Sequence, residues 1–271
     1  SAGYSYANRN MPDRRRDNTV LNTDTNQLEV ENLNEINREF SRLNEHILSA
    51  NINYQHDFAF GDFTPTLKMG GYTEYRTREY NTRLFIYSWK NGLPSNYRVM
   101  NVPDELMQDK NYGEDKLYLL EQVDWRNNYE GNNMLGAGYA GVNLPFGKWN
   151  IYAGVRFEHS RMELISNTQK NEKSPTSVYY TYDDFFPSLN AAYRLNEQHQ
   201  FRLSYGRTVN RPEFREVSSS VYYDFDLASN VQGNYDLKAA YIDYIDLGYE
   251  YYPSNGELIS VSLFYKRFKN P

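Results

Sequence analysis

The chain has 271 residues, of which 16% are aromatic, 24% are charged and 27 are tyrosine. Its 29 basic and 35 acidic residues give a net charge of −6, which argues against nucleic-acid binding, and the absence of cysteine excludes a disulfide framework and a thiolate metal site. No apolar run approaches the ~20 residues of a transmembrane helix, whereas this polar and aromatic composition suits a sheet with lipid on one face and water on the other.

Alternation of apolar and polar residues predicts antiparallel strands along most of the chain. In the last of them, Ile259, Val261 and Leu263 alternate with Ser260 and Ser262, so the apolar side chains share one face. About nine strands are predicted, at residues 1–7, 46–58, 63–80, 133–144, 148–160, 181–195, 200–208, 239–252 and 256–268. Single-chain bacterial barrels usually close with an even number of strands. Because nine is odd, this pattern predicts a piece of a larger barrel.

One segment, within residues 28–47, does not follow the strand pattern. Its apolar residues recur at intervals of three and four, which is the period of a helix: Leu33, Ile36, Phe40, Leu43 and Ile47. Both a short helix and an extended loop arm before the strand at 46–58 fit this spacing.

Short and long connections alternate between the predicted strands. The short ones are turn-like and cover 59–62, 145–148, 196–199 and 253–256. The long, polar ones cover about 8–45, 81–132, 160–180 and 208–238. In an antiparallel meander all short turns then fall at one end and all long loops at the other, as in outer-membrane barrels. A soluble binding domain with its loops at one end would share this arrangement.

Several strings in the second half of the chain resemble the barrel of TonB-dependent outer-membrane receptors, of the type common in Bacteroidetes. They are FPSLN at 186–190, LNEQHQ at 195–200, RLSYGR at 202–207, NRPEF at 210–214 and YAGVRFE at 152–158. GNYDLK at 233–238 is similar to a further family turn, although Tyr235 and Ala239 stand where that turn usually has prolines. The resemblance is specific over residues 133–271.

The resemblance implies an all-β fold, an antiparallel up-and-down meander that forms part of a transmembrane barrel of about 22 strands with long extracellular loops. Residues 1–271 would be one segment of that barrel domain, without the plug domain that closes such receptors. It also implies the outer membrane of Gram-negative bacteria, contact with lipid, and a TonB complex that drives uptake of a siderophore, cobalamin or an oligosaccharide. Whether a surface lipoprotein caps the receptor stays open.

The best candidate for ligand binding is the aromatic and acidic stretch at 221–226. Its rings suit stacking on a sugar or chelator, and its carboxylates suit acceptance of hydrogen bonds from hydroxyl groups. The candidate ligand-binding residues are Trp89, Arg211, Tyr222, Tyr223, Asp224, Phe225 and Asp226. The alternative for the tyrosines is an interfacial aromatic girdle, and the alternative for Arg211, which precedes Pro212, is that the pair only ends a strand.

No pattern in the sequence indicates an enzyme, a metal site or a cofactor. The four histidines are scattered, no carboxylate pair has the spacing of a glycosidase, and neither a phosphate loop nor a nucleophile elbow is present. The basic run Arg14–Arg16 suits either a solvated loop or contact with an anionic ligand or lipopolysaccharide phosphate. The alternative functions are a passive porin or adhesin barrel and a soluble, β-rich, glycan-binding module.

Overall fold

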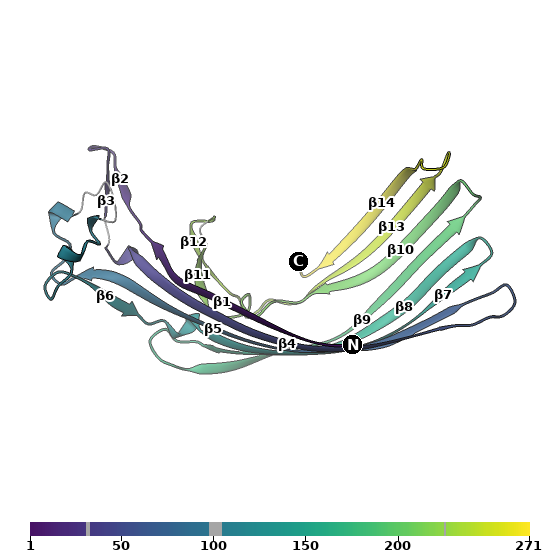
Figure 1. Ribbon diagram of the computed structural model, residues 1–271, viewed down its shortest axis with the longest axis horizontal. Helices are drawn as coiled ribbons and strands as arrows, with labels where there is room; N and C mark the ends of the chain where they lie inside the picture. Colours follow the sequence, from purple (N-terminus) through teal and green to yellow (C-terminus); the bar gives the residue numbers. More distant parts are fainter. Residues whose placement is uncertain (31–32, 98–104, 225) are drawn as a thin grey trace.

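The computed structural model describes residues 1–30, 33–97, 105–224 and 226–271, and in this part of the chain its main feature is one curved, ten-stranded antiparallel sheet (Figure 1). Nine strands follow one another in chain order: β1 (Ala2–Arg16), β4 (Asn37–Asp57), β5 (Thr66–Trp89), β7 (Tyr129–Phe146), β8 (Trp149–Asn167), β9 (Pro175–Arg194), β10 (His199–Asn210), β13 (Ala240–Tyr251) and β14 (Ile259–Lys269). The predicted meander is therefore confirmed.

The remaining elements belong to the connections. β6 (Leu117–Gln122) pairs with the end of β5, and two hairpins stand apart from the sheet, β2–β3 (Val20–Asn22 and Gln27–Glu29) and β11–β12 (Val221–Asp224 and Ser229–Gln232). The described 3-10 turns include η1 (Leu33–Glu35), η2 (Ser95–Tyr97), η4 (Asp109–Asn111) and η5 (Trp125–Asn127). No helix in the described ranges is long and apolar enough to cross a membrane.

The two faces of the sheet differ in chemistry, as the alternation predicts. On β14 the outer-face residue Leu263 is 69% exposed and lies opposite Leu247 of β13, whereas the inner-face neighbour Ser262 lies opposite Gly248. Because an exposed apolar face of this extent needs an apolar surrounding, the outer face is the one suited to lipid.

Aromatic residues border the apolar part of the outer face at two levels. Trp149 and Phe157 lie eight residues apart on β8, which is about 26 Å at the ~3.3 Å rise of a strand residue. Trp149 packs on Tyr193 with 4.6 Å between ring centres, and Phe157 packs on Phe185 with 5.0 Å. The spacing matches the apolar band of about 25 Å that aromatic girdles border in outer-membrane barrels.

The strands extend far beyond this apolar band, which corrects three of the predicted loops. β8 continues for ten residues past Phe157 and carries His159, Arg161 and Glu163 on the outer face. β1, β4, β5 and β9 also extend beyond the band. Because β8 ends at Asn167 and β9 begins at Pro175, the connection predicted at 160–180 covers only residues 168–174. Above the band the outer face of β8 meets water, whereas Met162 and Leu164 on its inner face are buried. The apolar side of the strand therefore changes, and the pattern of the lipid-facing part is lost. The four short turns and the long connection near 208–238 are confirmed.

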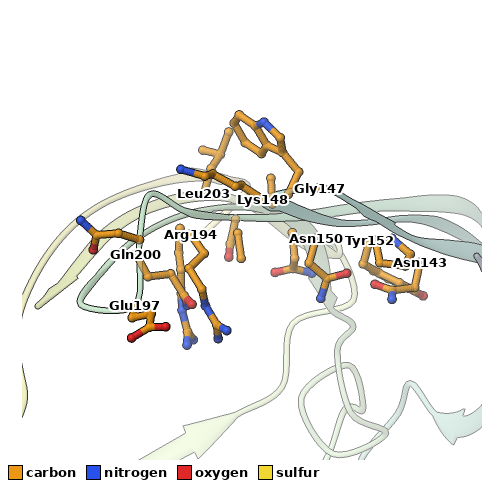
Figure 2. A pocket seen from close by; sticks show the side chains of 17 residues that line it. Asn143, Gly147, Lys148, Asn150, Tyr152, Arg194, Glu197, Gln200 and Leu203 are labelled. Carbon is orange, nitrogen blue, oxygen red and sulfur yellow. The ribbon is translucent and has the colours of Figure 1, made fainter. Parts of the chain in front are cut away.

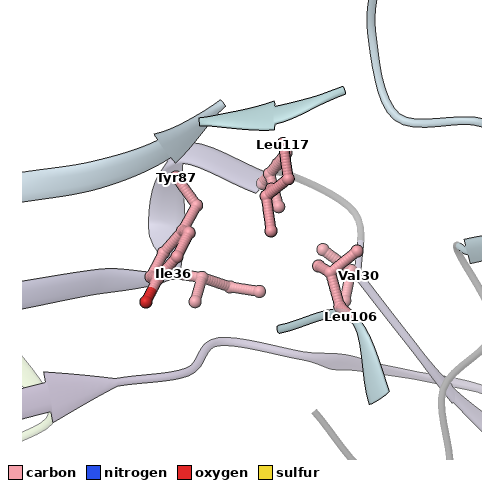
Figure 3. Close-up of a cluster of buried hydrophobic side chains, with 6 residues drawn as sticks. Val30, Ile36, Tyr87, Leu106 and Leu117 are labelled. Carbon is pink, nitrogen blue, oxygen red and sulfur yellow. The ribbon is translucent and has the colours of Figure 1, made fainter. Parts of the chain in front are cut away.

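The helical spacing within 28–47 arises from two environments and not from a helix. Leu33 and Ile36 lie in and just after η1 and are buried in an apolar cluster, while Phe40, Leu43 and Ile47 lie on strand β4. The cluster joins the β1–β4 and β5–β7 connections (Figure 3), and its buried members are Val30, Leu33, Ile36, Tyr87, Leu106 and Leu117. The strand therefore begins at Asn37, ahead of the predicted boundary.

A pair of arginine substitutions tests the assignment of the two faces. Leu263→Arg places a charge on the outer face and should lower the free energy of unfolding by about 2–4 kcal/mol in lipid vesicles. Ser262→Arg, one residue away on the inner face, should lower it by less than about 1 kcal/mol, because the lumen holds water. Urea titration followed by tryptophan fluorescence measures both, and equal losses would contradict the assignment.

Candidate ligand-binding site

The connection between β10 and β13, residues 211–239, turns back over the concave inner face of the sheet. Figure 1 shows its hairpin β11–β12 inside the curve of the sheet, above β4 and β5. A loop that stays over the lumen needs contacts to hold it there, since a free loop gains conformational entropy in solvent. Three groups of contacts anchor this connection.

The first anchor is Arg211, the residue directly after β10. Its Nη1 donates to Glu158 at 2.7 Å and its Nη2 donates to Asp184 at 2.9 Å. The hydroxyl of Tyr241 donates to the same Asp184 at 2.7 Å. Burial works to lower the pKa of Arg211, but the two carboxylates outweigh it and the pKa is raised. The arginine is therefore held by two strands at once, β8 and β9.

The second anchor is Phe214, whose side chain is 1% exposed. It packs directly on the backbone of Gly131 in β7, where a Cβ atom would lie 2.3 Å from the phenyl ring. The guanidinium groups of Arg76 and Arg78 each lie 5.6 Å from the ring centre, and both donate to Glu45. The ring thus fills a site that only glycine leaves open, beside two arginines whose charge is shared with a carboxylate.

The third anchor is the buried run Ser218–Ser220. The hydroxyl of Ser219 lies 2.8 Å from the carbonyl oxygen of Asn167 and 3.0 Å from that of Arg126. The backbone N–H of Val221 donates to the side chain of Asn127 at 2.9 Å. These bonds tie the start of β11 to η5 and to the outer end of β8.

Together the anchors hold the β11–β12 hairpin beside the outer ends of β1, β4 and β5, where it encloses a polar cleft of about 320 Å³. Five of the residues that line the cleft carry side-chain amides: Asn34, Asn37, Gln122, Asn127 and Asn230. Three arginines (Arg14, Arg16 and Arg126) face three carboxylates (Glu35, Glu39 and Asp124), so the formal charge of the lining is 3 − 3 = 0. The cleft offers many hydrogen-bond donors and acceptors without a bias toward one sign of charge.

Internal pairing holds several of these polar groups in place. Arg14 bonds Glu39 at 2.5 Å, and Nη2 of Arg126 bonds Asp124 at 2.7 Å. The hydrogen bond that Arg126 donates to Asp124 raises the pKa of Arg126, although burial works to lower it. Arg16 lies 4.2 Å above the ring centre of Tyr223. A ligand would therefore meet a prearranged set of polar groups.

The structure brings only part of the predicted site together. Tyr222 and Tyr223 line the cleft, and a guanidinium covers one face of each ring: Arg215 lies 3.3 Å from the ring centre of Tyr222, and Arg16 covers Tyr223. Arg211 and Pro212 directly follow the last residue of β10, as expected if the pair ends the strand, and Arg211 serves as an anchor of the loop.

The other predicted residues lie elsewhere or have local roles. Asp224 accepts hydrogen bonds from the backbone N–H groups of Asp226 and Leu227, at 2.9 and 3.0 Å, and so shapes the tip of the hairpin. Asp226 is exposed at that tip. Trp89 packs against the apolar cluster, 5.3 Å from the ring of Tyr97. Phe225 lies outside the described residues.

Sequence reasoning missed several residues of the cleft. Arg126 and Asn127 belong to a 3-10 turn within a connection that carries no recognisable motif, and Glu39 lies on a section of β4 that the sequence pattern predicts as a loop. The run Arg14–Arg16 stands out in the sequence by its charge, and Arg14 and Arg16 line the cleft. Only the fold reveals that these segments meet.

A second and larger hollow, of about 790 Å³, lies at the end of the sheet that carries the short turns. Figure 2 shows Asn150 and Arg194 on one side of the strands there and Lys148 and Leu203 on the other. Within the described residues no group of three or more histidine or acidic side chains could hold a metal ion. The cleft under the β11–β12 hairpin is the better candidate for a ligand from outside, because it lies at the end with the long loops.

Comparison with known proteins gives a family and several structures of the same fold. The family model for "TonB dependent receptor-like, beta-barrel" matches residues 1–271. The unliganded ferric citrate transporter FecA is similar with a TM-score of 0.56 and 14% identity, over 89% of this chain and 30% of that chain. The closed form of the ferric-catecholate import receptor Fiu from K12 E. coli has a TM-score of 0.54 and 15% identity, over 89% of this chain and 34% of that chain.

The open form of Fiu from E. coli K12 is also similar, with a TM-score of 0.53 and 13% identity over 99% of this chain and 38% of that chain. At such identities the likeness establishes the fold alone. The chain spans about a third of the length of these structures. Among the curated proteins, none matches this sequence.

Removal of the first anchor should release the loop from the inner face. Arg211→Ala leaves Glu158 and Asp184 facing each other without their shared cation, and breaking such a buried pair costs about 3–5 kcal/mol. We expect faster proteolytic cleavage within residues 211–239, measured by limited proteolysis and mass spectrometry. Arg83→Ala removes an exposed pair with Glu121, which is worth about 0–1 kcal/mol, and should leave the cleavage rate unchanged. Equal rates in both variants would contradict the anchoring role.

Proposed function

We propose that this chain, which belongs to the family of TonB dependent receptor-like β-barrels, takes part in energy-coupled uptake of a polar ligand. Membership of the family places the chain in the outer membrane of Gram-negative bacteria, in a transport barrel and not in an enzyme. The observation that carries the proposal is the cleft under the β11–β12 hairpin. The cleft lies over the lumen, at the end of the sheet that carries the long loops. Its lining consists of polar groups that are held in place.

The chemistry of the cleft supports a ligand rich in hydroxyl groups. Amides, carboxylates and arginines line it with no net formal charge, and such a lining can form many hydrogen bonds with a neutral ligand. Among siderophores, cobalamin and oligosaccharides, this pattern favours the oligosaccharide over a strongly anionic iron chelate. Tyr222 and Tyr223 would bind through their hydroxyl groups and ring edges, since an arginine already covers one face of each ring.

The proposed receptor is larger than this segment of 271 residues. β1 and β14 do not pair with each other in the described part of the chain, so the sheet is open at both edges. We propose that residues 1–271 form one segment of a barrel domain, of the type common in Bacteroidetes, whose lumen a plug closes. A protein of native mass several tens of kDa above 32.0 kDa in a detergent extract of outer membranes is the expected result. A native mass near 32.0 kDa would contradict it.

Filling the cleft should weaken binding without unfolding the barrel. Asn230 lies in β12 and lines the cleft, whereas its neighbour Ser229 does not. Asn230→Trp should weaken binding of the ligand by at least about tenfold, a loss of ~1.4 kcal/mol, because the indole occupies the cleft. Ser229→Trp serves as the matched control. Calorimetric titration of the intact receptor against panels of oligosaccharides, siderophores and cobalamin measures the effect, and equal affinities of the two variants would exclude this cleft.

Energy coupling separates active uptake from the alternatives. Collapse of the proton-motive force with a protonophore should stop accumulation of the ligand in intact cells while surface binding persists. Uptake that continues unchanged would indicate a passive porin. A native protein that stays in solution without detergent would instead indicate a soluble binding module.

A further inference from the structure

The outer face of the sheet carries an apolar groove of about 520 Å³ that the uptake function does not use. It lies across β8, β9, β10, β13 and β14 near the short-turn end. By register, Ala191 of β9 stands between Ile151 of β8 and Leu203 of β10. A small side chain therefore interrupts a row of large ones and leaves room beside them. The volume falls in the range of about 300–1,000 Å³ that is common for sites of single small molecules.

One wall of the groove is a continuous row of four aromatic side chains, one from each of four neighbouring strands: Trp149, Tyr193, Phe201 and Tyr249. The ring centres of Trp149 and Tyr193 are 4.6 Å apart, and those of Phe201 and Tyr249 are 5.1 Å apart. The hydroxyl of Tyr249 is further held by His199 at 2.7 Å. Packed rings of this kind form a stiff wall, and aromatic rings of this type mark the level of the lipid headgroups.

A cation lies at the same level as this wall. Lys148 precedes Trp149, its side chain is exposed, and Figure 2 shows it on the same side of the strands as the groove residue Leu203. Its ammonium donates to the carbonyl oxygen of Leu195 at 2.5 Å. An ammonium group has three donors, so two remain for another acceptor. The apolar groove matches the acyl chain of a phospholipid, and the cation beside it, at headgroup level, matches the phosphate.

We propose that this groove binds one glycerophospholipid of the periplasmic leaflet, with an acyl chain along Ala191 and the phosphate at Lys148. The short-turn end of such barrels faces the periplasm, which places the site in that leaflet. The aromatic wall orders the chain from one side, and Leu203 and Leu247 flank it from the other. The site lies on the outer face and is separate from the ligand cleft on the inner face.

Native mass spectrometry of the intact receptor, purified in detergent and titrated with phosphatidylglycerol, tests the proposal. The wild-type receptor should retain one lipid more tightly than any further lipid. Ala191→Phe fills the groove and should weaken that first binding step by at least about tenfold. Ala140→Phe adds the same ring at an exposed outer-face alanine of β7 outside the groove, and it should leave the step unchanged.

A second variant tests the headgroup contact. Lys148→Gln should weaken phosphatidylglycerol binding by about fivefold, since one lysine contributes modestly at a lipid headgroup, and it should leave the binding of uncharged diacylglycerol unaffected. Circular dichroism confirms that each variant keeps its strands. Equal effects of Ala191→Phe and Ala140→Phe would show only non-specific lipid around the barrel and would overturn the proposal. A receptor dimer that forms without lipid and is lost in Ala191→Phe would assign the groove to a second copy and would overturn it too.

Discussion

Every backbone N–H and C=O group that enters a bilayer must find its hydrogen-bond partner within the protein. The strands of the sheet that lie between β1 and β14 meet this requirement in a single antiparallel ladder, in which each strand pairs with the neighbour on either side, and only the outer edges of β1 and β14 are open in the described part of the chain. The ladder imposes a period of two on the side chains, so that Leu263 and Ser262 must face opposite surroundings. The apolar band, the aromatic borders and the lipid groove all lie on one side of this ladder, and the ligand cleft lies on the other.

The inner face follows a second constraint, which is the cost of burying charge. Arg211, Glu158 and Asp184 are all mostly buried, with side chains 18%, 13% and 11% exposed. Such charges are tolerated only when they are paired and hydrogen-bonded. Pairing of one loop arginine with carboxylates from two strands therefore does more than neutralise charge, because it also fixes where the loop leaves the sheet. The cleft under the β11–β12 hairpin depends on that fixed position.

The same physical logic explains where sequence reasoning succeeded and where it failed. Between the aromatic borders one face meets lipid, the alternation is strong, and the short turns were predicted close to their observed positions. Beyond the borders His159 and Glu163 face outward, and the buried residues of the same strand, such as Leu164, lie on the inner face under the β10–β13 connection. Composition there resembles a loop, and the strands were predicted too short. The spacing at 33–47 leaves a helix and an extended arm both open, because a buried loop cluster and a strand share a helical spacing there.

The sequence by itself determined the fold class, the order of the strands and the membrane-facing residues, because the period-two pattern and the turn residues are local properties of the chain. It also singled out Tyr222 and Tyr223, which do line the cleft. Only the tertiary structure decided that Arg14, Glu39, Arg126 and Asn230 meet there. These residues come from four segments far apart in the chain, and their meeting depends on strand register and on a loop held by buried ion pairs, which no local pattern encodes.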